Sequence, residues 1–286
     1  MAASPADWAA EASHLIADCF DHAKPYLDQA YEGLAPLVRF VAAQLFIDCH
    51  LSSESSLLLI HSGREWDADI ISRSVMEGSV KLAYMLYGST SEIEAKVDEY
   101  WQVLPLFFAI RHGENARQFL DAVPDADALE WQPFKELLVE PEEVSSIRAS
   151  YSKRARQEIE ERWSFAGICR FFARTGEPGF QHIGQYLAHG YSMSSHLVHK
   201  DADSIGMIWE RSTRDEVRRT AVSLGHSARV VSDACAFAQL RLLALLRACG
   251  GSKQVLIDIG TKYEKLTEAL TAAINYFNEV EYGSKP

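Results

Sequence analysis

The spacing of apolar residues constrains the fold of this chain more than any other feature of its sequence. Between only nine prolines and 16 glycines, apolar residues recur mostly at the three- and four-residue intervals of an amphipathic helix, with few alternating runs. Such helices each bury one face against their neighbours. We therefore predict an all-α protein, a multi-helix bundle of about seven to nine helices.

The helix boundaries are predicted from capping residues and from glycine and proline. Ser4 or Asp7 is expected to cap the first helix, and Pro25 to break or kink it. Ser91 and Glu94 resemble a capping box, Pro105 is a second candidate for a kink, and 200–204 is expected to be a loop. The predicted helices are 4–31, 36–61, 64–87, 91–120, 163–174, 179–199, a long helix to Cys249 capped by Ser212 or Thr213, and 252–282.

We expect a single helical domain over residues 1–286, with N-terminal helices in 1–49, a core in 50–250 and a C-terminal helix in 251–286. Between 123 and 162 the composition shifts toward Asp, Glu and Pro and then toward Arg. Prolines separate short segments there. This stretch is predicted to leave the main bundle and to be its most mobile part.

Charge and composition exclude several classes of function. The net charge of -12 repels a polyanion at long range, so stable binding of duplex DNA is not expected. The five cysteines are scattered without a CxxC spacing, which fits a reducing cytoplasm. No signal-peptide pattern and no membrane-spanning apolar stretch is recognised, so we expect a cytoplasmic protein that does not insert into a membrane.

Two charged residues lie in an apolar seam of the predicted helix 64–87. The seam consists of Trp66, Ile70, Arg73, Glu77, Val80 and Tyr84. One interpretation is an i,i+4 ion pair of Arg73 and Glu77 at the edge of the core. The other is an inward-facing Arg73 that binds an anion while Glu77 orients its guanidinium group.

Histidines concentrate on one stripe of the predicted helix 179–199. His189, His196 and His199, together with Asp201 or Asp203, can converge on a divalent metal, although their spacing matches no specific zinc pattern. Without a metal, His199 one turn after Ser195 can act as a general acid or base toward a ribose hydroxyl or a phosphate. Ser195 lacks a nucleophile elbow, so serine hydrolase chemistry is disfavoured.

The only local concentration of positive charge follows residue 147. It comprises Arg148, Lys153, Arg154, Arg156, Arg162, Arg170 and Arg174, interleaved with aromatic residues. One interpretation is a seat for RNA or a nucleotide. The other is a solvated helix surface, because Glu158, Glu160 and Glu161 interrupt the run at ion-pair spacing. No glycine-rich phosphate loop is present in the sequence.

Three segments carry a resemblance to known proteins: IISRSVMEGSVKLAYMLYG, WSFAGICRFFARTG and YSMSSHLVHKDADS. In this order they resemble an uncharacterised bacterial all-helical family over about residues 50–250. That family is distantly similar to HEPN domains, the small helical modules of prokaryotic toxins and phage-defence proteins, many of which are metal-independent ribonucleases. Ser194 stands where the HEPN motif has an arginine, and Arg73 is the candidate to replace that arginine in space.

The leading hypothesis is a HEPN-like protein that binds or cleaves RNA or a nucleotide, in a toxin or phage-defence setting. The resemblance also implies a homodimer. No metal and no cofactor is assigned under this hypothesis. The assigned catalytic residues are His199 as acid or base, Arg73 as anion clamp, Glu77 as orienter and Ser195, and the assigned substrate-binding residues are Tyr191, His196, Arg154 and Arg156.

Two alternatives stay open. The first is a non-catalytic helical interaction or regulatory protein, in which the same residues form a buried polar network that fixes helix register. The second is a metal-binding protein based on the histidine stripe.

Overall fold

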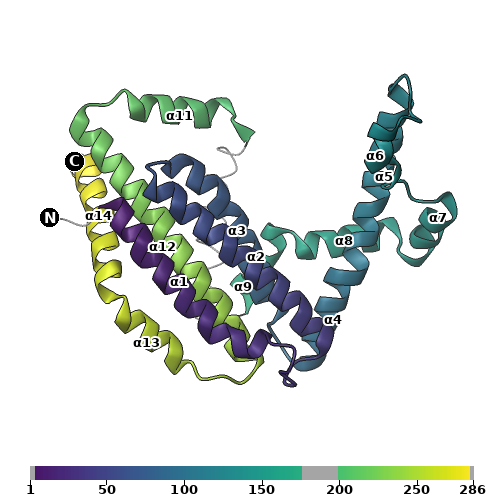
Figure 1. Ribbon diagram of the computed structural model, residues 1–286, viewed down its shortest axis with the longest axis horizontal. Coiled ribbons are helices and arrows are strands. Elements are labelled where there is room, and N and C mark those ends of the chain that lie inside the picture. Colours follow the sequence, from purple (N-terminus) through teal and green to yellow (C-terminus); the bar gives the residue numbers. More distant parts are fainter. Residues whose placement is uncertain (1–3, 176–198, 284–286) are drawn as a thin grey trace.

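The computed structural model describes residues 4–175 and 199–283. Within these ranges the chain forms α-helices, one π-helical turn and one 3-10 turn, and no β-strand (Figure 1). The predicted all-α class is therefore confirmed. The described residues contain more helices than the seven to nine expected, because two predicted helices are divided and because short helices form in 123–162 and 202–212.

The main bundle is built around one long helix. This helix, α12 (Glu216–Ala248), packs against α1 (Pro5–Leu27), α2 (Pro36–His61), α3 (Glu65–Met85) and α14 (Glu264–Tyr282). Apolar and small residues occupy most sides of α12, as a helix surrounded by neighbours requires. The fully buried side chains of Ile16, Phe46, Leu82 and Leu245 mark the core between these helices.

The first two helices begin as their sequences predict. Ser4 caps α1 and forms a capping box with Asp7. Pro25 does not break α1, because it lies in the last turn, and the helix ends at Leu27 rather than near Tyr31. The bounds of α2 match the prediction at both ends.

The segment after α3 differs from its prediction in two ways. The capping box is formed by Ser89 and Glu92, not by Ser91 and Glu94. The helix it opens is also not continuous: α4 (Thr90–Asp98) passes through a π-helical turn, η1 (Glu99–Val103), into α5 (Leu104–Ala122). The Leu104 N–H donates to the carbonyl of Glu99, and the next residue, Pro105, has no N–H to continue the regular pattern.

Three further helix boundaries differ from the predictions, and at two of them an aspartate caps the helix. Asp201 caps α11 (Ala202–Ser212), so most of the expected loop at 200–204 is helical. Asp215, rather than Ser212 or Thr213, caps α12. The last predicted helix is divided at Tyr263 into α13 (Gln254–Lys262) and α14.

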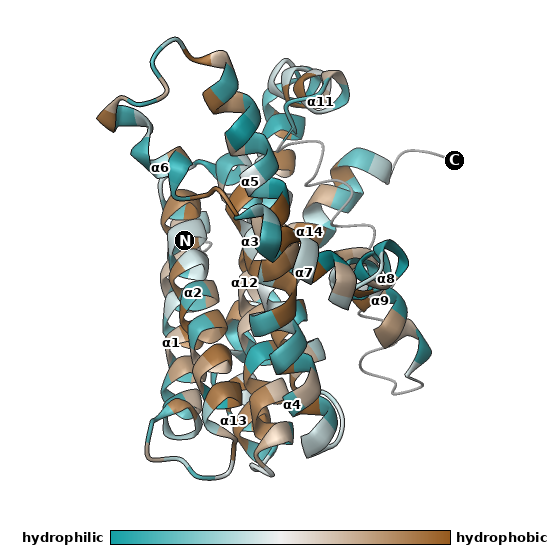
Figure 2. Cartoon of the chain, turned by 90° about the vertical axis from the view of Figure 1, so that its right-hand side faces the viewer, coloured by the Kyte–Doolittle hydropathy of each residue, from teal (hydrophilic) through white to brown (hydrophobic). Residues whose placement is uncertain are grey.

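Short helices connect α5 back to the bundle. They are η2 (Leu129–Trp131), α6 (Gln132–Lys135), α7 (Pro141–Ser150), α8 (Lys153–Trp163) and α9 (Phe165–Arg174). Figure 1 shows α6 and α7 projecting away from the bundle, while α9 returns to α3. Figure 2 shows that α8 is mainly hydrophilic, whereas apolar residues line α12 and α3. The mobility expected for 123–162 stays a prediction.

Two expectations remain, the helix predicted at 179–199 and the absence of a membrane-spanning helix. The predicted helix 179–199 lies outside the described residues, apart from His199 at its end. Among the described residues, none of the helices combines the length and the apolar character that crossing a membrane requires.

Candidate functional site

Arg73 and Glu77 form the ion pair that their spacing predicts. Arg73 Nε lies 3.2 Å from Glu77 Oε1, and both side chains are partly buried. One turn further along α3, Lys81 Nζ lies 3.9 Å from the other carboxylate oxygen of Glu77. Glu77 is thus shared by two cations, Arg73 and Lys81. Lys81 also lines a pocket at this part of α3.

This pocket, here called the aromatic pocket, has a volume of about 460 Å³. Its walls come from three separate stretches of the sequence: α3, the π-helical turn with the start of α5, and the end of α8. Single π-helical turns within helices occur often at functional sites, and this one supplies Tyr100 and Trp101 to the wall. The residues that define the pocket are Lys81, Tyr100, Trp101, Phe108, Arg111 and Trp163.

The wall at Trp163 is fixed by polar and aromatic contacts. Its indole Nε1 donates to Glu99 Oε1 at 2.6 Å. Its ring centroid lies 5.0 Å from that of Tyr100 and 5.1 Å from that of Tyr84. Trp163 is only 4% exposed, so these contacts hold it as a fixed and largely covered wall of the pocket.

The two cations of the aromatic pocket are held by carboxylates without being deeply buried. Arg111 Nη2 lies 3.0 Å from Glu160 Oε1, and half of the Arg111 side chain stays exposed. The Arg111 guanidinium also lies 5.0 Å from the centroid of the Phe108 ring. The pocket therefore combines aromatic faces with two positive groups, a set that suits a flat anionic ligand.

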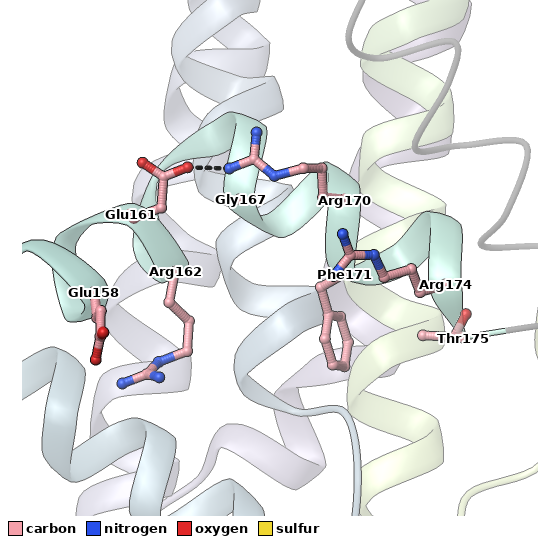
Figure 3. A pocket seen from close by; sticks show the side chains of 8 residues that line it. All are labelled: Glu158, Glu161, Arg162, Gly167, Arg170, Phe171, Arg174 and Thr175. Carbon is pink, nitrogen blue, oxygen red and sulfur yellow. Dashed lines mark hydrogen bonds and ion pairs between the residues drawn. The ribbon is translucent and has the colours of Figure 1, made fainter.

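A second pocket, the basic pocket, lies at the corner of α8 and α9 and has a volume of about 390 Å³ (Figure 3). Arg162, Arg170 and Arg174 line it, together with Phe171. Figure 3 shows Arg170 extended toward Glu161, with which it forms an ion pair. Arg162 bonds to both carboxylate oxygens of Glu99. Of these three arginines, only Arg174 has no carboxylate partner among the described residues.

Carboxylates also neutralise much of the remaining basic stretch. Arg148 pairs with Glu114 at 2.8 Å, and Arg154 pairs with Glu158 at 2.8 Å. Arg156 is half-buried, and its Nε atom has no hydrogen-bond partner. Such pairing is typical of a solvated helix surface, and it weakens this stretch as a track for a polyanion. The assignment of Arg154 and Arg156 to substrate binding stays a prediction.

The histidine segment contributes one described residue. His199 is exposed at the start of the second described range, and no contact among the described residues joins it to Arg73 or Glu77. His189, Tyr191, Ser195 and His196 lie outside the described residues. The part of the chain that the structure describes contains no cluster of His, Cys, Asp and Glu able to hold a metal. The catalytic assembly around His199 stays a prediction.

Sequence reasoning missed a buried polar cluster between α3 and α12. Arg229 donates to Asp69 at 2.6 Å and to Asp233 at 3.1 Å. His226 Nε2 lies 3.6 Å from Asp69, and the His226 ring centroid lies 4.1 Å from that of Trp66. The i,i+4 spacing of Arg229 and Asp233 was a readable signal, but their burial depends on the packing of two helices distant in sequence.

The electrostatics of this cluster follow from its burial. Desolvation raises the pKa of Asp233 to about 6. The attraction of Arg229 opposes this rise, and the neighbouring Asp69 carboxylate adds to it. Burial and then the nearby Arg229 and Arg211 guanidinium groups lower the pKa of His226 well below its usual value. The cluster therefore holds a neutral imidazole beside a carboxyl group that titrates in mildly acidic solution.

A second missed group is Arg241, which has no exposed surface. It donates to the Ser79 hydroxyl at 2.7 Å, and its guanidinium lies 5.4 Å from the centroid of the Phe46 ring. Among the described residues, its Nε and Nη2 atoms have no hydrogen-bond partner. A buried arginine without a carboxylate is unusual, because the desolvation of its charge is not offset.

The fold and the pockets define an all-α bundle with an aromatic, partly cationic pocket beside the Arg73–Glu77 pair. A scan against models of protein families, a search of curated proteins and a search of solved structures found no match to this chain.

Proposed function

We propose that the protein binds a nucleotide, either free or within single-stranded RNA, in the aromatic pocket. The observation that carries this proposal is the combination of the exposed rings of Trp101 and Phe108 with the cations Lys81 and Arg111 in one pocket. Stacking of a base on an aromatic side chain contributes about 1–3 kcal/mol. Arginine and lysine side chains supply the donors that phosphate oxygens accept.

The size and exposure of the pocket suit such a ligand. Its volume of about 460 Å³ lies within the range of roughly 300–1,000 Å³ that is common for small-molecule sites. Trp101 and Phe108 keep 40% and 44% of their surface exposed, so they are available to a ligand at the rim. A short ligand also avoids the long-range repulsion from the net charge of -12, which a long polyanion would meet.

Binding can be tested with the full chain by calorimetry against AMP, ATP and a five-nucleotide single-stranded RNA. We expect Trp101→Ala and Arg111→Gln to weaken binding at least tenfold, because they remove a stacking face and a phosphate donor. The matched control is Trp209→Ala, which removes an indole that is exposed on α11, 71% against 40% for Trp101, and lies outside the pocket.

The outcomes separate the ligands and the two pockets. Binding of AMP and ATP alone assigns a free nucleotide, and binding of the oligonucleotide alone assigns RNA. If no ligand binds, or if Arg174→Gln in the basic pocket weakens binding while Arg111→Gln does not, the assignment to the aromatic pocket is wrong.

Cleavage of RNA is a further part of the proposal and is supported only by the HEPN resemblance. It assigns the acid or base to His199 and the anion clamp to Arg73, in a toxin or phage-defence setting. The test is incubation of the protein with labelled total RNA and tRNA, with EDTA or with magnesium, comparing wild type and His199→Ala. Cleavage that survives EDTA and is lost in the folded variant supports this part, and uncleaved RNA in all lanes contradicts it.

A second candidate function is a non-catalytic helical interaction protein. The buried cluster of Asp69, Arg229 and Asp233 favours it, because polar networks of this kind can fix the register of packed helices. The two candidates differ in a simple readout. An interaction protein binds none of the nucleotide ligands, and its aromatic-pocket variants behave like the wild type.

A further inference from the structure

The outer side of α2 exposes a row of large apolar residues. Phe40, Ile47, Leu51 and Leu58 keep 48%, 41%, 55% and 66% of their surface exposed. The opposite side of the same helix is buried in the core. Single exposed apolar residues are ordinary, but these four follow one another along one face of one helix. Such a row is typical of a helix that packs against another helix.

The full row follows a heptad pattern. Two polar residues, Gln44 and Glu54, occupy the remaining places of the row and are also exposed. Successive members are separated alternately by four and three residues, the spacing that keeps side chains on one face of a helix. We call this set the α2 stripe; its members are Phe40, Gln44, Ile47, Leu51, Glu54 and Leu58.

The α2 stripe reads the same in both directions. From either end its order is apolar, polar, apolar, apolar, polar, apolar, and its spacing is also symmetric about the midpoint between Ile47 and Leu51. A two-fold symmetric interface requires a surface that complements a reversed copy of itself. An unrelated partner would impose no such symmetry.

We propose that the α2 stripe binds the α2 stripe of a second copy of this chain, with the two helices antiparallel. In this arrangement Phe40 lies opposite Leu58 of the second copy, and Ile47 lies opposite Leu51. Gln44 lies opposite Glu54, where its amide donates to the carboxylate. Every apolar residue therefore meets an apolar residue, and each polar residue meets a complementary one.

The parallel arrangement is disfavoured by the same residues. It places Glu54 opposite Glu54 and Gln44 opposite Gln44. Like charges that face each other across a helical seam repel, which destabilises that alignment. The single charge of the stripe, on Glu54, therefore favours the antiparallel dimer.

The α2 stripe is long enough for an extended contact between two helices. The stripe spans about 27 Å at a rise of about 1.5 Å per residue. At one end of the stripe the Trp101 ring lies 5.3 Å from the Phe40 ring, but Trp101 belongs to the aromatic pocket and is not counted in this interface. In the antiparallel dimer this end meets the Leu58 end of the second copy. A stable interface buries about 800 Å² per partner, so the exposed residues of α2 beside the stripe take part as well.

The first test is the mass of the full chain in solution, measured by light scattering and by sedimentation at micromolar concentration. Wild type is expected to be a dimer, and Leu51→Glu a folded monomer with at least a tenfold weaker association. Leu129→Glu is the matched control, because Leu129 is 86% exposed on the projecting segment and should leave the dimer intact. A monomeric wild type, or a dimer unaffected by Leu51→Glu, would overturn the proposal.

A second test examines the antiparallel alignment through disulfide formation. Gln44→Cys and Glu54→Cys are purified separately and oxidised mildly, alone and mixed. The native cysteines are buried apart from the partly buried Cys249, so the unchanged chain serves as the background. The mixture is expected to form a cross-linked dimer in high yield, and each variant alone only traces. Efficient self-linking of either variant would contradict the antiparallel alignment.

Both tests are independent of the proposed nucleotide site. Gln44, Leu51 and Glu54 do not line the aromatic pocket. Dimer formation can therefore fail while nucleotide binding holds, and the reverse.

Discussion

Two regions of the molecule pair an arginine with a carboxylate at the same i,i+4 spacing, in different surroundings. On α12, Arg229 and Asp233 form an i,i+4 pair whose side chains are 34% and 18% exposed, and Arg229 also bridges to Asp69, which is 3% exposed. On α8, Arg154 and Glu158 form an i,i+4 pair in water. The first pair connects two helices of the bundle, whereas the second stays within a single helix.

The difference shows that burial, rather than pairing, determines the effect of a charge. In water an ion pair competes with hydration and gains little. In the interior each charge has lost its hydration, so a remaining partner becomes costly once the other is removed. The α3–α12 cluster should therefore respond strongly to substitution and to pH, and the α8–α9 surface should respond weakly to both.

The largest expected effect comes from Arg229→Ala. This variant leaves Asp69 buried without its 2.6 Å hydrogen bond from Arg229 and should lower the free energy of unfolding by about 3 kcal/mol or more. Urea denaturation monitored by circular dichroism measures it. A loss as small as that of an exposed-pair variant would show that the cluster is hydrated, and the contrast between the two regions would disappear.

The next effect concerns pH and Asp233. Its pKa in the folded chain is raised to about 6, so the folded state holds a proton that the unfolded chain releases at a pH near 4. The contribution of Asp233 to stability is therefore complete below the unfolded pKa and is lost as the pH rises to about 6. Relative to Asp233→Asn, the wild type should lose about 2–3 kcal/mol between pH 4 and pH 7.

Urea denaturation of both proteins at several pH values measures this difference. Comparing the two cancels the opposite contribution of His226, whose pKa is lowered in the folded state. A pH-independent difference between the two proteins would mean that Asp233 is ionised throughout.

Most of the fold could be predicted from periodicity, and the errors have local causes. Ser89 and Ser91 each have a glutamate three residues later, so the sequence offers two capping boxes. Gly88 ends the preceding segment with a φ of 115° and so favours the earlier one. The π-helical turn could not be predicted, because it depends on a shift of one hydrogen bond before Pro105.

The site was less predictable, because it joins distant parts of the chain. The Arg73–Glu77 pair was readable, since both residues lie on one helix. The aromatic pocket forms only because Trp163, at the end of α8, packs beside the π-helical turn, and this contact between distant segments has no signal in the sequence. The burial of Arg241 was also invisible, because a single arginine in an apolar helix is typical of a side chain that extends its head into water.

Arg241 offers the complementary test, because it is a buried charge that has no carboxylate partner among the described residues. Removing it therefore leaves no buried carboxylate unpaired. Arg241→Met keeps most of the volume and removes the desolvated charge together with its bond to Ser79. The free energy of unfolding should stay unchanged or rise by about 1–2 kcal/mol. Thermal and urea denaturation measure this, with Ser79→Ala as the control for the lost hydrogen bond. A clear destabilisation would mean that the Arg241 charge is itself stabilised in the folded protein.

The smallest expected effect belongs to the exposed pair of Arg148 and Glu114, which connects α7 to α5 over 2.8 Å with about half of each side chain exposed. Screening by water and salt limits such a pair, so a double-mutant cycle of Arg148→Ala and Glu114→Ala should give a coupling of about 0.5 kcal/mol or less. The coupling should fall further in 1 M salt. A coupling above about 2 kcal/mol would place this surface pair with the buried cluster, and burial alone would then not explain the difference between the two regions.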